Sequence, residues 1–179
     1  LRFKNIPVKV TFNNMERIEN LASRVSKFIE ADSLSLMNSF NKKTFLESND
    51  LDTESVFSIF LPNTYEFYWN TSADQFRDKM LDQFKLFWNP SRIKKAKSYN
   101  LNPIEVSILA SIVQRETPKV DERPTISGVY YNRLRRKMKL QADPTIVYTI
   151  KLEKGFDTRI RRVLYIDLRI RLSLIHISE

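Results

Sequence analysis

The sequence predicts an α+β fold, with a small strand-and-helix subdomain followed by a mainly helical domain. Residues 8–12 alternate between apolar and polar side chains, which is typical of a short strand. From residue 73 onward, apolar side chains recur every three or four positions, as in amphipathic helices. With 179 residues and 42% hydrophobic side chains, the chain is long enough for one large domain or two small ones.

The first subdomain is expected to begin with the strand at residues 8–12. Asn13 or Asn14 can then cap a helix that runs to about Ile29. Residues 32–54 are rich in Ser, Asn and Asp and predict a short helix and loops, and residues 55–60 are the expected returning strand. We place the domain boundary so that the first subdomain spans residues 1–69 and the second domain spans residues 70–179.

The second domain is expected to start with a helix from Ala73 to about Trp88, capped by Thr71 or Ser72. Its apolar side chains recur at helical spacing and predict a core helix. Asn89 and Pro90 end it, and the basic residues 91–98 are expected to form a solvated face.

A central helix is predicted to begin at Pro103. Asn102 can cap it, and Glu105 lies three residues later, as in a capping box. One face of this helix is apolar and the other is polar. The apolar residues are Ile104, Ile108, Leu109, Ile112 and Val113.

Glu116 falls on the apolar face, in the last turn before Pro118. One interpretation is structural: Glu116 pairs with Arg123 or Arg133 and holds the turn. The other is catalytic: burial and the negative end of the helix dipole favour the protonated carboxyl group, which then acts as a general acid. The spacing alone leaves both open.

Two further helices are expected. The first runs from about Pro124 to Arg136 and buries Val129 and Tyr130; Gly128 in its interior suggests close approach of another backbone. The second, from Thr145 to about Leu152, would be capped by Asp143 and closed by Gly155.

Composition excludes several kinds of site. The chain has no Cys, and its one histidine, His176, lies in the terminal tail, so neither a thiolate metal site nor a serine–histidine triad is expected. The net charge is +9, with 15 basic and 9 acidic residues in 101–179 (+6) against 15 and 12 in 1–100 (+3). Such a balance suits a polyanion, but does not select nucleic acid, anionic lipid or a carboxylated cell-wall polymer.

No apolar run approaches the roughly 20 residues that span a bilayer, and no secretory signal pattern is present. The chain begins at Leu1 rather than Met, which suggests that an upstream segment has been lost or removed.

An ordered series of short motifs resembles the endolytic murein transglycosylases, the YceG-like family of bacterial cell envelopes. The motifs are Ser111-Ile-Val-Gln-Arg-Glu116-Thr117, Glu122-Arg123-Pro124, Gly128-Val129, Asn132-Arg133-Leu134, Leu140-Gln141-Ala-Asp143-Pro144-Thr145 and, more weakly, Leu61-Pro62-Asn63-Thr64-Tyr65-Glu66-Phe67. The resemblance implies that Glu116 is the catalytic residue.

This resemblance implies cleavage of the bond between N-acetylmuramic acid and N-acetylglucosamine in peptidoglycan, with a 1,6-anhydro product. Glu116 would act first as the acid and then as the base, without cofactor or metal. The implied substrate-binding residues are Asn132, Gln141, Asp143, Thr145, Tyr148, Arg123 and Arg133. Arg123 and Arg133 would meet peptide or lactyl carboxylates, although surface ion pairs are an equally good use of both. Glu122 suits a helix start better than a second catalytic carboxylate.

The resemblance also implies a LysM-like role for residues 1–69 and, as partners, peptidoglycan glycan strands and the peptidoglycan synthases at the membrane. Family members are tethered to the inner membrane by one N-terminal helix, with the enzyme outside the cytoplasm. The tail 169–179 departs from the family pattern, which suggests truncation or out-of-frame sequence, and an incomplete cleft.

Two other functions remain as alternatives. The helix at 103–117, the turn, and the basic helix after it imitate a helix-turn-helix motif, which would bind nucleic acid. We expect no nucleic acid partner, because such a motif does not require Glu116 on the apolar face. The second alternative is a glycan-binding remnant without activity.

Overall fold

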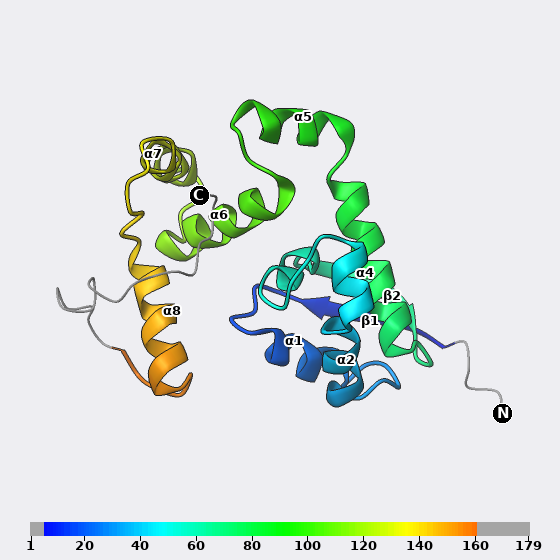
Figure 1. Ribbon diagram of the computed structural model, residues 1–179. Coiled ribbons are helices and arrows are strands. Elements are labelled where there is room, and N and C mark those ends of the chain that lie inside the picture. Colours follow the sequence, from blue (N-terminus) through cyan, green and yellow to red (C-terminus); the bar gives the residue numbers. More distant parts are fainter. Residues whose placement is uncertain (1–5, 161–179) are drawn as a thin grey trace. The chain divides into compact units, whose positions relative to one another are not determined.

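The computed structural model describes residues 6–160 and has the predicted α+β fold, with a two-stranded antiparallel sheet and mostly helices (Figure 1). The atypical tail 169–179 and His176 lie outside the described residues. The elements are β1 (Pro7–Phe12), α1 (Ile18–Val25), α2 (Ser33–Phe40), α3 (Lys43–Ser48), the 3-10 helix η1 (Ser55–Ile59), β2 (Asn63–Tyr68), α4 (Ala73–Phe87), α5 (Pro90–Ser98), α6 (Pro103–Glu116), α7 (Arg123–Arg135) and α8 (Asp143–Lys154).

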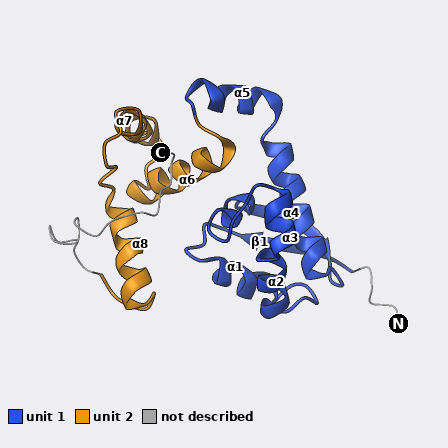
Figure 2. Ribbon diagram, viewed as in Figure 1, with its two compact units in different colours: residues 1–100 blue, residues 101–179 orange. Residues whose placement is uncertain are grey.

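The chain forms two compact units, residues 1–100 and 101–179 (Figure 2). The boundary expected at residue 69 therefore lies inside the first unit. The reason is that α4 packs on α2: the Arg77 guanidinium on α4 donates hydrogen bonds to the carbonyl and hydroxyl oxygens of Ser39 on α2.

The returning strand is β2, not residues 55–60. In β2 the alternating residues Tyr65 and Phe67 are buried, and Val10 of β1 pairs with Tyr65. Residues 55–59 form η1 instead, because the Asp52 carboxylate accepts hydrogen bonds from the backbone N–H groups of Glu54 and Ser55 and stabilises a turn there.

Aromatic side chains fill the core of the first unit. Phe40 from α2 lies 4.6 Å from Phe60 between ring centroids, and Phe67 from β2 lies 5.0 Å from Phe76 on α4. Phe40 and Phe76 are completely buried. This core joins the sheet, α2 and α4, so the strand, the early helices and α4 are one packed body.

Other boundaries in the first unit also differ from expectation. The helix after β1 begins only at Ile18, without a side-chain cap from either asparagine, and residues 32–54 form two helices. The basic stretch 91–98 belongs to α5, where the Asn89 side chain accepts a hydrogen bond from the Arg92 N–H and so begins a new helix. The lysine side chains of α5 are exposed, as expected for a solvated face.

The capping box of α6 is confirmed in the second unit. The Asn102 side chain accepts a hydrogen bond from the Glu105 N–H at 2.9 Å, and the Glu105 carboxylate accepts one from the Asn102 N–H at 2.7 Å. This reciprocal pair fixes where α6 begins, and therefore which residues its last turn contains.

Three details of α7 and α8 differ from the sequence prediction. Val129 is 50% exposed rather than buried. A Cβ atom on Gly128 would have no neighbour within 4 Å, so no backbone approaches it. Asp143 is the first residue of α8 and not its cap, because the helix begins one residue after Ala142. Gly155 does close α8, with φ of 94°.

None of the helices in residues 6–160 combines the length and the hydrophobicity that spanning a bilayer requires.

Candidate active site

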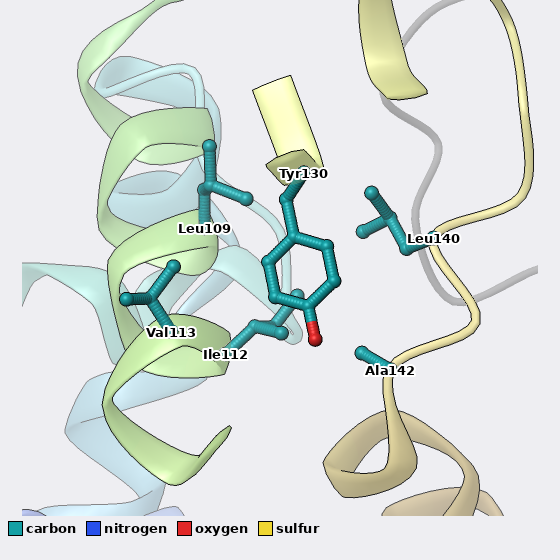
Figure 3. Close-up of a cluster of buried hydrophobic side chains, with 6 residues drawn as sticks. All are labelled: Leu109, Ile112, Val113, Tyr130, Leu140 and Ala142. Atoms are coloured by element: carbon teal, nitrogen blue, oxygen red, sulfur yellow. The ribbon is translucent and has the colours of Figure 1, made fainter. Parts of the chain in front are cut away.

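The apolar face of α6 packs around one tyrosine of α7. Leu109, Ile112 and Val113 form the buried part of that face, and the Tyr130 ring lies against it (Figure 3). Leu140 and Ala142, in the segment between α7 and α8, cover the other side of the ring. Tyr130 is only 6% exposed. The cluster therefore brings the end of α6, the middle of α7 and the start of α8 together.

Glu116 belongs to the surroundings of the Tyr130 hydroxyl group. Burial, a hydrogen bond to the Glu116 carboxylate and the charge of that carboxylate together raise the pKa of Tyr130 to about 12. Arg133 and Asp143 also act on the hydroxyl, through their charges. The fold thus gathers the catalytic candidate and two binding candidates around one buried phenol.

Glu116 itself is exposed, contrary to the expected burial among apolar side chains. It follows Ile112 and Val113 on the same face, but α6 ends at Glu116 and Thr117 is already extended (φ −140°, ψ 134°). The last side chain therefore extends past the packed cluster. No ion pair of Glu116 occurs within the described part of the chain, so it does not pair with Arg123 or Arg133 as the structural interpretation required.

Glu122 is engaged in the turn between α6 and α7. Its carboxylate accepts hydrogen bonds from the Thr117 hydroxyl at 2.7 Å and the Lys119 ammonium at 2.9 Å. These two donors, Lys119 first, hold the pKa of Glu122 below its ordinary value. Glu122 is thus kept ionised and has a structural role in the turn, whereas Glu116 has no ion pair within residues 6–160.

Arg133 organises the segment that follows α7. Its Nη1 donates hydrogen bonds to the carbonyl oxygens of Lys139 and Leu140 and to the side-chain oxygen Oε1 of Gln141, at 3.1, 2.9 and 2.8 Å. Its own carbonyl accepts the N–H of Met138 at 2.9 Å. One residue therefore holds both ends of the turn that leads to α8.

The remaining predicted binding residues lie around this core at different distances. The Thr145 hydroxyl donates to the carbonyl of Ala142 at 2.7 Å, within the first turn of α8. Tyr148, 37% exposed, makes an edge contact with Phe156. The Arg123 guanidinium donates to the Pro118 carbonyl at 3.5 Å, in the turn after α6, and Asn132 is exposed on α7. Within residues 6–160, no hydrogen bond or ion pair joins Asn132 or Thr145 to Glu116.

Tyr130 is the site residue that sequence reasoning missed, because its spacing assigned it to the core. The signal was its chemistry: a buried phenol normally finds a hydrogen-bond partner, whereas a phenylalanine in the same place needs none. No group of three or more potential metal-ligating side chains exists within residues 6–160.

Comparison with known proteins indicates the same family as the sequence motifs. The YceG-like family model matches residues 1–171. A protein of Streptococcus pneumoniae named endolytic murein transglycosylase is 37% identical over 87 residues, which are 49% of this chain and 16% of that protein. A protein of the same name from Bacillus subtilis is 34% identical over 112 residues, 61% of this chain and 29% of that protein.

A solved structure has the same fold. The crystal structure of a protein described as YceG-like from Listeria monocytogenes superimposes with a TM-score of 0.70 and 19% identity, and covers 90% of this chain and 56% of that one. The chain spans less than a third of the length of the two curated relatives above. Because the family model matches nearly the whole chain, the protein belongs to the YceG-like family.

Proposed function

We propose that this protein is an endolytic lytic transglycosylase that cleaves peptidoglycan glycan strands between N-acetylmuramic acid and N-acetylglucosamine. The observation that carries the proposal is the exposed Glu116 carboxylate at the end of α6, in a chain of the YceG-like family. The names of its relatives support the same reaction class.

Glu116 is the proposed acid of the first step. It donates its proton to the glycosidic oxygen, the bond from that oxygen to the anomeric carbon breaks, and an oxocarbenium-like sugar forms. Because Glu116 is exposed before substrate binds, the glycan itself would exclude water from the carboxyl group. In this proposal, the bound substrate creates the water-excluded surroundings in which Glu116 acts as proton donor.

Glu116 is then the proposed base of the second step. The carboxylate takes the proton of the 6-hydroxyl group on the same muramyl ring, and that oxygen bonds to the anomeric carbon. The product carries a 1,6-anhydro ring, Glu116 regains its proton, and no water is consumed. One carboxyl group is sufficient for this sequence, which fits the engagement of Glu122 by Thr117 and Lys119.

Tyr130 supports Glu116 in this proposal. Its hydroxyl group is neutral at ordinary pH, as in any tyrosine, and burial first of all raises its pKa further, to about 12. A neutral phenol next to Glu116 donates to the carboxylate form without adding charge. Tyr130 therefore orients the carboxylate for the second step.

The substrate contacts are proposed from the family motifs. Asn132, Gln141 and Thr145 are candidates for hydrogen bonds to acetamido and hydroxyl groups, and Tyr148 for contact with a sugar ring. Asp143 and Arg123 are weaker candidates for polar contacts. The proposed partners are glycan strands and the peptidoglycan synthases, and the proposed location is the outer side of the inner membrane, to which a longer form would be anchored.

Digestion of purified peptidoglycan tests the proposal. The wild-type protein should release muropeptides with anhydro ends, identified by mass, and Glu116→Gln should lower the rate by about a thousandfold or more. Reducing ends would make the protein a hydrolase. If neither protein releases products but both bind sacculi, the chain is a glycan-binding protein, and salt-sensitive retention on DNA would favour the nucleic-acid alternative.

A further inference from the structure

The Gln141 side chain has a fixed polarity in this structure. Its Oε1 accepts a hydrogen bond from Arg133 Nη1 at 2.8 Å. A guanidinium group has donors and no acceptor, so the amide group must turn its oxygen toward Arg133. The Nε2 group, with two N–H donors, is then directed away from Arg133, and no hydrogen bond to it occurs within residues 6–160.

The backbone at Gln141 supports a role for this side chain. Gln141 has φ of 53°, in the left-handed region that a glycine would occupy with less strain. A non-glycine residue at such a position costs about 1 kcal/mol, and such strain tends to persist where the side chain has a function. The conformation is maintained by Arg133, which also binds the carbonyl oxygens of Lys139 and Leu140.

Gln141 also lies beside the candidate active site. Its neighbours Leu140 and Ala142 both pack in the cluster around Tyr130, and they are only 8% and 0% exposed (Figure 3). Arg133, which holds Gln141, and Glu116 both influence the pKa of the Tyr130 hydroxyl group, which Arg133 lowers and Glu116 raises. Gln141 itself is exposed, so its amide is accessible to a ligand.

We infer that Arg133 is a positioning residue that fixes Gln141 as a hydrogen-bond donor to the carbonyl oxygen of an acetamido group on the bound glycan. The amide carbonyl is the strongest neutral acceptor on an N-acetylated sugar, and the presented group offers only donors. Arg133 thereby sets the preference for an acetamido group indirectly, because its Nη1 binds Gln141 and not the sugar. The inference rests on the proposed function and assigns the polarity of one of its contacts.

The test uses Gln141→Glu, which keeps the acceptor for Arg133 and replaces both N–H donors by an oxygen. The probes are peptide-free glycan strands, either fully N-acetylated or partly de-N-acetylated, titrated against the chain in the Glu116→Gln background to prevent cleavage. Gln141→Glu should weaken binding to the acetylated strands and, because a carboxylate attracts an ammonium group, strengthen binding to the deacetylated ones. The ratio of the two affinities should fall by about tenfold or more.

Gln114→Glu is the matched control, since Gln114 is exposed on α6 and the change adds the same charge. It should shift the affinity ratio less than twofold. An equal shift in both glutamate variants, or no shift in Gln141→Glu, overturns the inference while the proposed function stands. Failure of the Glu116→Gln protein to bind any strand overturns the proposed function and this inference with it.

Arg133→Met tests the positioning role, because it frees the amide of Gln141 to turn either way. The effect of Gln141→Glu on the affinity ratio should then be several times smaller in the Arg133→Met background than in its absence. A merely structural Arg133 would lower the melting temperature but leave the effect of Gln141→Glu unchanged, and that result would contradict the inference.

Discussion

Arg77 in the first compact unit and Glu116 in the second have contrasting surroundings. In the first unit, Arg77 is only 7% exposed, and its guanidinium binds Asp74, Asp78 and the Ser39 carbonyl. A hydrogen bond from Ser39, helped by the charges of Arg77 and Lys42, lowers the pKa of Asp74. In the second unit, Glu116 lies at the end of an apolar helix face and has no ion pair within the described residues.

The left-handed backbone positions show the same contrast. In the first unit they are occupied by Asp50 and Asn100, residue types that tolerate this conformation. In the second unit they are occupied by Lys137 and Gln141, which do not. The second unit therefore carries the less tolerated left-handed residues, on either side of Leu140 of the Tyr130 cluster, and departures of this kind are expected near a functional site.

The largest effect on stability is expected at Arg77. Arg77→Met should lower the free energy of unfolding by about 2 kcal/mol, because the buried Ser39 carbonyl loses its donor and Asp74 loses its partner. Glu116→Gln should change it by less than about 0.5 kcal/mol. Urea unfolding measures both, with Arg135→Met, at an exposed position of α7, as the control. A larger loss at Glu116 than at Arg77 would reverse the comparison.

Tyr130 predicts a pH dependence of stability. Its pKa is raised from 10 to about 12 in the folded protein, so the folded state holds this proton more tightly than the unfolded one. The resulting stability is complete below pH 10 and is lost as the pH rises toward 12; we expect it to amount to about 1 kcal/mol after solvent screening.

Thermal unfolding of the wild type and Tyr130→Phe at pH 8 to 11.5 measures this effect. The melting temperature of the wild type, measured relative to that of Tyr130→Phe, should fall as the pH rises. Parallel curves across that range would show that the hydroxyl group does not lie beside the Glu116 carboxylate.

Gly128 offers a smaller, stabilising change in the second unit. A Cβ atom there meets nothing within 4 Å and the residue lies inside α7, so Gly128→Ala should raise the free energy of unfolding by about 0.7 kcal/mol. Denaturant midpoints check this. A loss of stability would mean that the space beside α7 is occupied in solution.

Lys137→Gly should stabilise the protein by about 0.5 kcal/mol. Lys137 follows α7 with φ of 54°, and its N–H and that of Met138 bond back to Leu134 and Arg133, as in a Schellman motif that favours glycine. Lys139→Gly is the control: it lies in the same turn without a positive φ and should be destabilising. If Lys137→Gly and Lys139→Gly change the free energy of unfolding equally, the positive φ at Lys137 carries no strain, and the contrast with the tolerated positions Asp50 and Asn100 is lost.

Local chemical rules explain which parts of the fold were predictable. The capping box at Asn102 and the apolar face of α6 depend on neighbours within one or two turns, so the sequence predicts both correctly. The strand expected at residues 55–60 failed because Asp52 side-chain bonds favour a turn over the apolar pattern. Glu116 is exposed because the apolar cluster around Tyr130 ends at Val113 and α6 ends at Glu116, and the spacing along α6 does not predict how far that cluster extends.

The family motifs indicated candidate site residues but not the contacts between them. Gln141, Arg133 and Asp143 come from segments whose contacts form only when the turn after α7 folds back on Tyr130. Arg133 was expected to meet carboxylates of the substrate, whereas its Nη1 binds the chain itself. A sequence lists such groups without indicating which of them bind one another.

The central claim is that the Glu116 carboxyl group alone serves as acid and then as base. Its most direct test is digestion of peptidoglycan in water enriched in oxygen-18. If Glu116 acts alone as acid and then base, the new ends are anhydro sugars that carry no heavy oxygen and are lighter than reducing ends by one water. Incorporation of oxygen-18 at the cleaved ends would mean that an activated water attacks the sugar, and would contradict the account.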